Sequence, residues 1–111
     1  MEISYIDSTL ARSCNDDATR ERRYGAALAL VLRRRLAEIA AVAHLGELRR
    51  MPAARLRGHP DGRLLLVSLG TAADLQMLPR DDPPPLLADG SLHELAVHAL
   101  LITAVQLAPA A

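Results

Sequence analysis

The sequence predicts an α+β domain: an N-terminal strand, an antiparallel helix pair, then a three-stranded antiparallel meander that completes one sheet. Three observations predict this. The chain opens on alternating polar and apolar residues, its first half carries an apolar stripe at helical spacing, and its second half carries short apolar runs between Gly- and Pro-rich turns. The 111 residues suit a single domain, residues 1–111, and are too few for two ordinary ones.

The first half supplies the opening strand and the longer helix. Residues 2–6 alternate and include β-branched side chains, which is typical of a strand. Asn15 and Asp16 are suited to cap the N-terminus of a helix. Gly25 interrupts the helical pattern, where it indicates a bend or a close approach. The stripe that follows has spacings of three and four and consists of Leu28, Val31, Leu32, Leu36 and Ile39.

A short second helix is expected over residues 45–51, because Pro52 ends the pattern. The brief connection around His44 would join the two helices as an antiparallel pair.

The second half supplies the meander. Residues 64–69 form an apolar run bounded by turn residues, and a weaker strand is expected over residues 74–78. Residues 80–89 contain three consecutive prolines and several acids, so they are expected to form an exposed loop. A final strand is expected over residues 97–107, although its Leu and Ala content also suits a helix.

The charge is unevenly distributed, although the chain is neutral overall. Residues 1–57 contain eleven Arg and seven acidic residues, whereas residues 58–111 contain two Arg and six acidic residues. All thirteen basic residues are Arg, which either reflects codon composition or favours phosphate and carboxylate contacts. The runs at residues 20–23 and 33–35 are either a solvated helix face or a surface for RNA or an acidic partner. With two Tyr and no Phe or Trp, the composition does not favour base stacking.

Other function classes have little support in the sequence. Cys14 is the only cysteine, which excludes an internal disulfide and a cysteine zinc cluster, and it is expected to be a small buried residue. His93 and His98 are poorly spaced for one metal ion, so no metal or other cofactor is expected. No signal peptide or membrane-spanning run is recognisable, and a soluble cytoplasmic protein with no membrane partner is expected.

Several features along the chain occur together in one known family. They are an opening strand Met1-Glu2-Ile3-Ser4-Tyr5, then Leu10, Cys14, Tyr24-Gly25, Leu36, Leu48, Pro52-Ala53-Ala54-Arg55, Asp89-Gly90-Ser91-Leu92, and the apolar run from Val97 to Val105. In their order and spacing they resemble the RelE/ParE superfamily of bacterial toxins, in its HigB-type killer protein branch. The resemblance covers nearly the whole chain, and the RelE/ParE-like fold has the strand order derived above.

The resemblance implies the toxin component of a type II toxin–antitoxin system. Most such toxins are ribosome-dependent mRNA endoribonucleases that need no metal, and the ParE branch inhibits DNA gyrase instead. The implied partners are a cognate antitoxin, of helix-turn-helix type, and the messenger RNA on the ribosome. A homodimer or a toxin–antitoxin hetero-oligomer is the implied assembly.

The resemblance also implies a set of site residues. Arg55 and His59 would be catalytic, with His59 as acid or base because an imidazole titrates near neutrality. Arg57 and Arg63 would bind RNA phosphates. The same four residues are also compatible with a solvated loop that has no site role.

Two departures from the family pattern bear on activity. Asp74 stands where the family has an Arg, so an anion replaces a cation. The terminal Asp-Tyr-His element of the family corresponds to Leu107-Ala108-Pro109. The sequence therefore predicts a degenerate active site. The alternative is a catalytically inactive toxin-fold protein that binds an antitoxin or another protein, including gyrase.

Overall fold

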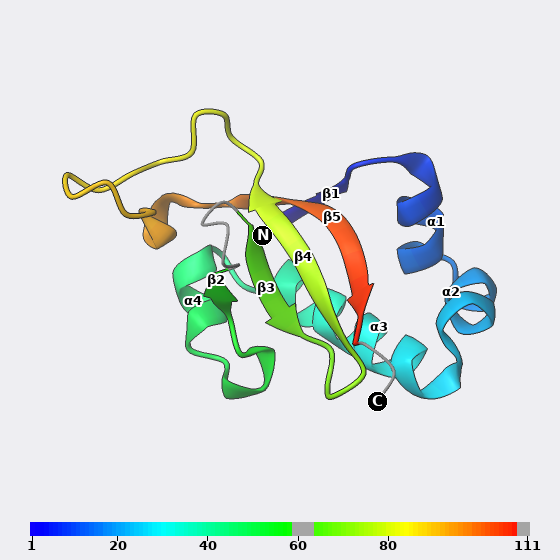
Figure 1. The fold of residues 1–111 in the computed structure, drawn as a ribbon. Helices are drawn as coiled ribbons and strands as arrows, with labels where there is room; N and C mark the ends of the chain where they lie inside the picture. Colours follow the sequence, from blue (N-terminus) through cyan, green and yellow to red (C-terminus); the bar gives the residue numbers. More distant parts are fainter. Residues whose placement is uncertain (59–63, 109–111) are drawn as a thin grey trace.

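The computed structural model describes residues 1–58 and 64–108, which form an α+β fold around one five-stranded open mixed sheet (Figure 1). The spatial order of the strands is β1-β5-β4-β3-β2. In chain order the strands are β1 (Glu2–Tyr5), β2 (Arg57–Gly58), β3 (Leu65–Ser68), β4 (Ala73–Pro79) and β5 (Ala99–Leu107).

The predicted meander is confirmed, because β3, β4 and β5 pair antiparallel with one another in turn. The opening strand β1 pairs in parallel with β5, with Glu2 opposite Ala99. The two-residue strand β2, which was not expected, pairs antiparallel with β3 and adds a fifth strand. A single extra residue at Thr103 shifts the register between β4 and β5, so β5 contains a β-bulge.

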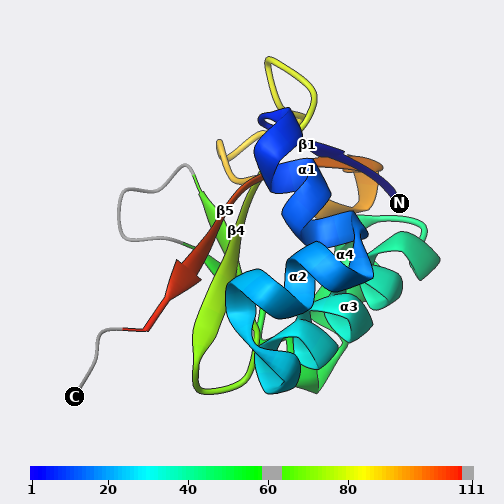
Figure 2. The same ribbon diagram turned by 90° about the vertical axis from the view of Figure 1, so that its right-hand side faces the viewer.

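Four α-helices take the place of the single antiparallel pair expected from the sequence. They are α1 (Ser8–Asn15), α2 (Asp17–Tyr24), α3 (Ala26–Ala41) and α4 (Leu45–Arg49), with 3₁₀ helices η1 (Pro52–Ala54) and η2 (Glu94–Ala96). Figure 2 shows α1, α2 and α3 gathered on one side of the sheet. No described helix covers the opposite face of β4 and β5.

Local capping explains the helix boundaries. The side chain of Asp16 accepts a hydrogen bond from the Thr19 amide at 2.8 Å, so the expected N-cap is confirmed. Gly25 ends α2 and precedes α3 with a φ of 81°, a conformation that strains any side chain, so the chain breaks there. Asp7 caps α1 in the same way through the Leu10 amide at 2.7 Å. This cap was not predicted from the sequence.

The prediction that the short helix pairs with the preceding long helix is wrong. The helix ends at Arg49, before the expected boundary, and α4 packs against η2 whereas α3 packs against α2. The amide of Leu45 donates to the Val97 carbonyl at 3.0 Å, which ties the start of α4 to the segment before β5.

The core lies between the sheet and its helices. It is aliphatic, as the composition requires, and its fully buried members include Leu32, Ile39, Leu45, Leu48, Val67, Leu75, Met77, Leu100 and Ile102. Cys14 belongs to the same cluster with 1% of its surface exposed, which confirms the expected buried cysteine. Burial raises the pKa of its thiol to about 11, so the thiol is protonated at neutral pH.

Within residues 1–58 and 64–108, no helix has the length and apolar character needed to cross a bilayer.

Candidate functional site

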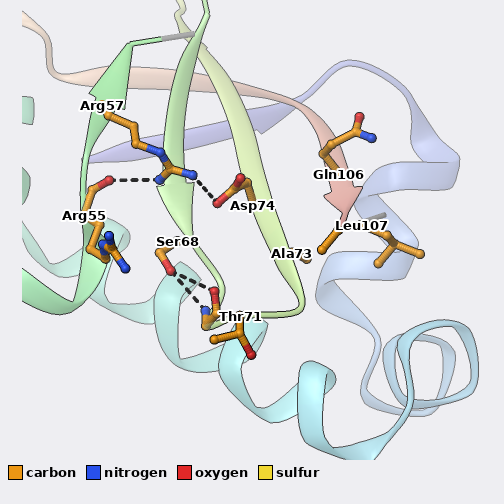
Figure 3. Close-up of a pocket in the computed structure, with 10 residues that line it drawn as sticks. Arg55, Arg57, Ser68, Thr71, Ala73, Asp74, Gln106 and Leu107 are labelled. Atoms are coloured by element: carbon orange, nitrogen blue, oxygen red, sulfur yellow. Dashed lines mark hydrogen bonds and ion pairs between the residues drawn. The ribbon is translucent and has the colours of Figure 1, made fainter. Parts of the chain in front are cut away.

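A groove of about 650 Å³ opens on the uncovered face of the sheet, beside the β3–β4 turn (Figure 3). Strand β2, the turn and the end of β5 all contribute to it. The lining residues are Arg55, Arg57, Ser68, Gly70, Thr71, Ala73, Asp74, Gln106, Leu107 and Ala108. The groove thus brings together two of the predicted site residues, Arg55 and Arg57, and three positions that depart from the RelE/ParE pattern, Asp74, Leu107 and Ala108.

Arg57 reaches the groove because β2 pairs with β3. It lies opposite Leu66, and Leu66 in turn lies opposite Gln76 of β4. From this position its Nη2 contacts Oδ1 of Asp74 at 2.6 Å, and its Nη1 donates to the Arg55 carbonyl at 3.1 Å (Figure 3). The guanidinium is therefore held by two groups of the groove itself.

Asp74 offsets the charge of Arg57. The two side chains are 31% and 42% exposed, so water screens their ion pair and its contribution to folding is modest. The effect on an anionic ligand is larger. A phosphate approaching Arg57 would meet the Asp74 carboxylate beside it, and the two charges nearly cancel at that distance.

Arg55 has a different environment. It ends η1 in the left-handed conformation, with φ 49° and ψ 52°, and its amide donates to the Pro52 carbonyl at 3.3 Å. A residue other than glycine is strained in this region, typically by about 1 kcal/mol or more. Its exposed side chain has no carboxylate within ion-pair distance among the described residues. Among the described lining residues, Arg55 is thus the cation without a counterion and can meet an incoming anion.

The floor of the groove is supported from the core by Arg35 of α3. Its Nε donates to the Ser68 carbonyl at 2.8 Å, and its Nη1 contacts Oε2 of Glu38 at 2.7 Å. Ser68 in turn bonds through its hydroxyl to both the carbonyl and the amide of Gly70 at 3.1 Å. Only 5% of the surface of Arg35 is exposed, whereas Arg33 and Arg34 are exposed, so the Arg33–35 run is not a uniformly solvated helix face.

The described lining holds no histidine, tyrosine or cysteine that could act as general acid or base. His59 and Arg63, predicted as catalytic and RNA-binding residues, lie outside the described residues. His98 is remote from the groove: its Nδ1 lies 3.1 Å from the Ala43 carbonyl, and its ring stands edge-on to His44.

In its described part the chain has no cluster of three or more His, Cys, Asp or Glu side chains that could hold a metal ion. In the described part of the groove, Arg55 can bind an anion, while the Arg57–Asp74 pair supplies a neutral wall that can form hydrogen bonds.

Comparison of the chain with protein-family models, with curated proteins and with solved structures found no match.

Proposed function

We propose that this chain is a toxin-type protein of the RelE/ParE kind, in its HigB-like branch, that acts by binding an antitoxin or another protein and does not cleave RNA. The Arg57–Asp74 ion pair, at 2.6 Å, is the observation that carries the proposal. RNA cleavage builds negative charge on a phosphate, and cations that are not already neutralised are needed to stabilise that charge. Here the position that carries a cation in the family carries the carboxylate that neutralises Arg57.

The carboxyl-terminal wall of the groove supports the same proposal. Leu107 and Ala108 line it where the family has an acid or base for the leaving oxygen. Neither side chain can transfer a proton. An apolar wall beside Arg55, a cation with no counterion among the described residues, suits a protein segment that carries both apolar and acidic side chains.

A ribosome-dependent endoribonuclease is the second candidate. Arg55 favours it, because this guanidinium lines the groove with no carboxylate of the described residues paired to it. In that case Arg55 would stabilise the phosphate, with Arg57 and Arg63 as further RNA contacts. His59, one residue beyond β2, would be the acid or base.

Expression in bacteria separates the two candidates. The binding function predicts normal growth, intact messenger RNA and stable co-purification with the product of the adjacent gene, a helix-turn-helix protein. Growth arrest with cleaved messenger RNA, relieved by Arg55→Ala or His59→Ala, would establish the nuclease and overturn the binding proposal. Arrest that survives both substitutions would exclude the catalytic assignments of Arg55 and His59.

Gyrase inhibition is a form of the binding function that has its own signature. A DNA-damage response in expressing cells, with intact messenger RNA, would identify gyrase as the bound protein. Its absence would leave the antitoxin as the partner under test.

A further inference from the structure

Strand β5 is longer than the strand that covers its outer side. β1 pairs with only the first four residues of β5, Ala99 to Ile102. The last backbone bond on this side joins the Ile6 amide to the Ile102 carbonyl at 3.0 Å. From Ala104 to Leu107, β5 pairs only with β4, so among the described residues its other side has no strand partner.

A second groove, of about 330 Å³, runs along this uncovered stretch of β5. Its other wall comes from α1, α2 and the turn before α1, and Figure 1 shows both helices extending past the sheet on the β1 side. Leu10, Tyr24 and Val105 contribute half-buried apolar surface. The lining residues are Asp7, Thr9, Leu10, Arg23, Tyr24, Thr103, Ala104, Val105 and Leu107.

Thr103 is an unsatisfied polar group in this groove. It is the extra residue of the β5 bulge, and bulges often redirect one side chain at a strand edge. Its hydroxyl is buried and has no hydrogen-bond partner among residues 1–58 and 64–108. Buried hydroxyls are normally paired, so this one is available to a group that enters the groove.

Arg23 supplies a positive charge to the groove. Its Nη1 donates to the Ser13 hydroxyl at 3.3 Å, and its guanidinium carbon lies 5.8 Å from the centre of the Tyr24 ring. No carboxylate of residues 1–58 or 64–108 lies within ion-pair distance of it. The carboxylate of Asp7, by contrast, already accepts the Leu10 amide as a helix cap. The groove therefore favours a ligand with an acidic group.

We infer that this edge binds an extended segment of a partner protein, which adds a strand beside Thr103–Leu107 of β5. Backbone hydrogen bonds to an uncovered strand give affinity in this mode, and alternate side chains give specificity. Apolar side chains on the inner face of the segment pack on Leu10 and Tyr24, and an acidic side chain pairs with Arg23. The inference does not depend on the proposed function, since Arg55 and Arg57 lie in the other groove.

A single segment fits this edge better than a second copy of the chain. Helices α1 and α2 extend past β5 on the helix-covered side of the sheet (Figures 1 and 2). If two copies paired antiparallel through β5, α1 and α2 of each copy would lie on the same side of the joined sheet and would compete for the same space beside β5. An isolated strand brings no helices with it.

A display library of random seven-residue peptides, selected on the full chain, tests the inference. Enriched peptides should alternate apolar and polar residues and carry Asp or Glu near one end. The best of them, made synthetically, should slow amide exchange in Ala104–Leu107. Arg23→Glu should weaken that peptide about tenfold and shift the enriched terminal residue to Lys or Arg. Arg22→Glu, an adjacent exposed position outside the groove, is the matched control and should leave affinity and selection unchanged.

Three results would overturn the inference. The first is enriched peptides without alternation. The second is selection that Arg23→Glu and Arg22→Glu change equally. The third is a stable dimer of the unliganded chain, seen by sedimentation, in which the amides of Ala104–Leu107 are already protected. Because the readouts concern Arg23 and β5, failure here leaves the growth and co-purification results for the Arg55 groove unaffected.

Discussion

The two faces of the sheet differ in how their residues are stabilised. The face under the helices is aliphatic, with Leu75, Met77 and Ile102 fully buried. The opposite face, around the first groove, carries Arg57, Asp74 and Gln106, all of them partly or largely exposed. Burial of apolar surface therefore determines stability on one face, whereas screened charge determines ligand preference on the other.

This difference implies that residues of one face of the sheet can be substituted without affecting the role of the other face. We expect substitutions on the open face to change ligand binding at little cost in stability, and substitutions on the covered face to be destabilising. Arg35 is the exception. It belongs to α3, on the covered side of the sheet, and its Nε donates a hydrogen bond to the carbonyl of Ser68, which lines the groove. The following predictions test this contrast, from the largest expected effect to the smallest.

Leu32→Ala should destabilise the fold by about 3 kcal/mol, because it removes a fully buried side chain at the centre of α3 and leaves a cavity. Urea denaturation followed by circular dichroism measures the effect. Leu30→Ala is the matched control, since Leu30 is 57% exposed on the same helix and should change stability by less than about 0.5 kcal/mol. Equal losses for the two variants would contradict the placement of Leu32 in the core of the covered face.

Arg35→Ala should cost about 2 kcal/mol, because it leaves the Ser68 carbonyl and the partly buried Glu38 without their donor. Arg34→Ala, exposed and adjacent, should be nearly neutral in the same denaturation assay. The variant should also loosen the β3–β4 turn, measured as faster amide exchange at Leu69 and Gly70. A neutral Arg35→Ala would mean that the two faces are not linked through this side chain.

Alkaline pH should destabilise the protein through Cys14, whose pKa burial raises to about 11. The unfolded thiol ionises first as pH rises, so the contribution is complete below pH of about 9 and is lost between about 9 and 11. The expected loss is about 2–3 kcal/mol, from a shift of about two pKa units at about 1.4 kcal/mol per unit. Burial also raises the pKa values of Tyr5 and Tyr24, so the measurement is the difference between wild type and Cys14→Ala. Parallel pH profiles for the two proteins would contradict the assignment.

Asp74→Asn should change stability by less than about 1 kcal/mol, because a partly exposed ion pair contributes little. The same change releases Arg57 from its counterion and should tighten binding of single-stranded RNA by roughly threefold at low salt. Filter binding measures this. Asp81→Asn, which removes an exposed carboxylate outside the groove, should leave RNA affinity unaltered. An identical gain for both variants would mean that only net charge matters.

Much of the fold could be predicted because its elements depend on local patterns. The apolar run at residues 64–69 and the run at residues 97–107 each became a strand, and Asp16 became an N-cap. Helix α1 was missed because Ser8–Asn15 is short and contains few apolar residues, and because the N-cap at Asp7 was not recognised. The two residues of β2 are too few to show any period.

The site could be predicted only in part because its geometry depends on contacts distant in sequence. The sequence indicated that Arg55 and Arg57 belong together, since they are two residues apart. The ion pair from Arg57 to Asp74 requires β2, β3 and β4 to be in register, which a list of residues does not reveal. The bulge at Thr103 depends in the same way on a shift between two strands.

The parallel pairing of β1 with β5 has a consequence for synthesis on the ribosome. Glu2 cannot find its partner Ala99 until nearly a hundred further residues have been made. Contacts between such distant parts of a chain form slowly, and a strand without a partner is prone to associate with other chains. The nascent protein must therefore hold its first strand unpaired through most of translation. Completion of the sheet is a late event that depends on release of the final strand from the exit tunnel.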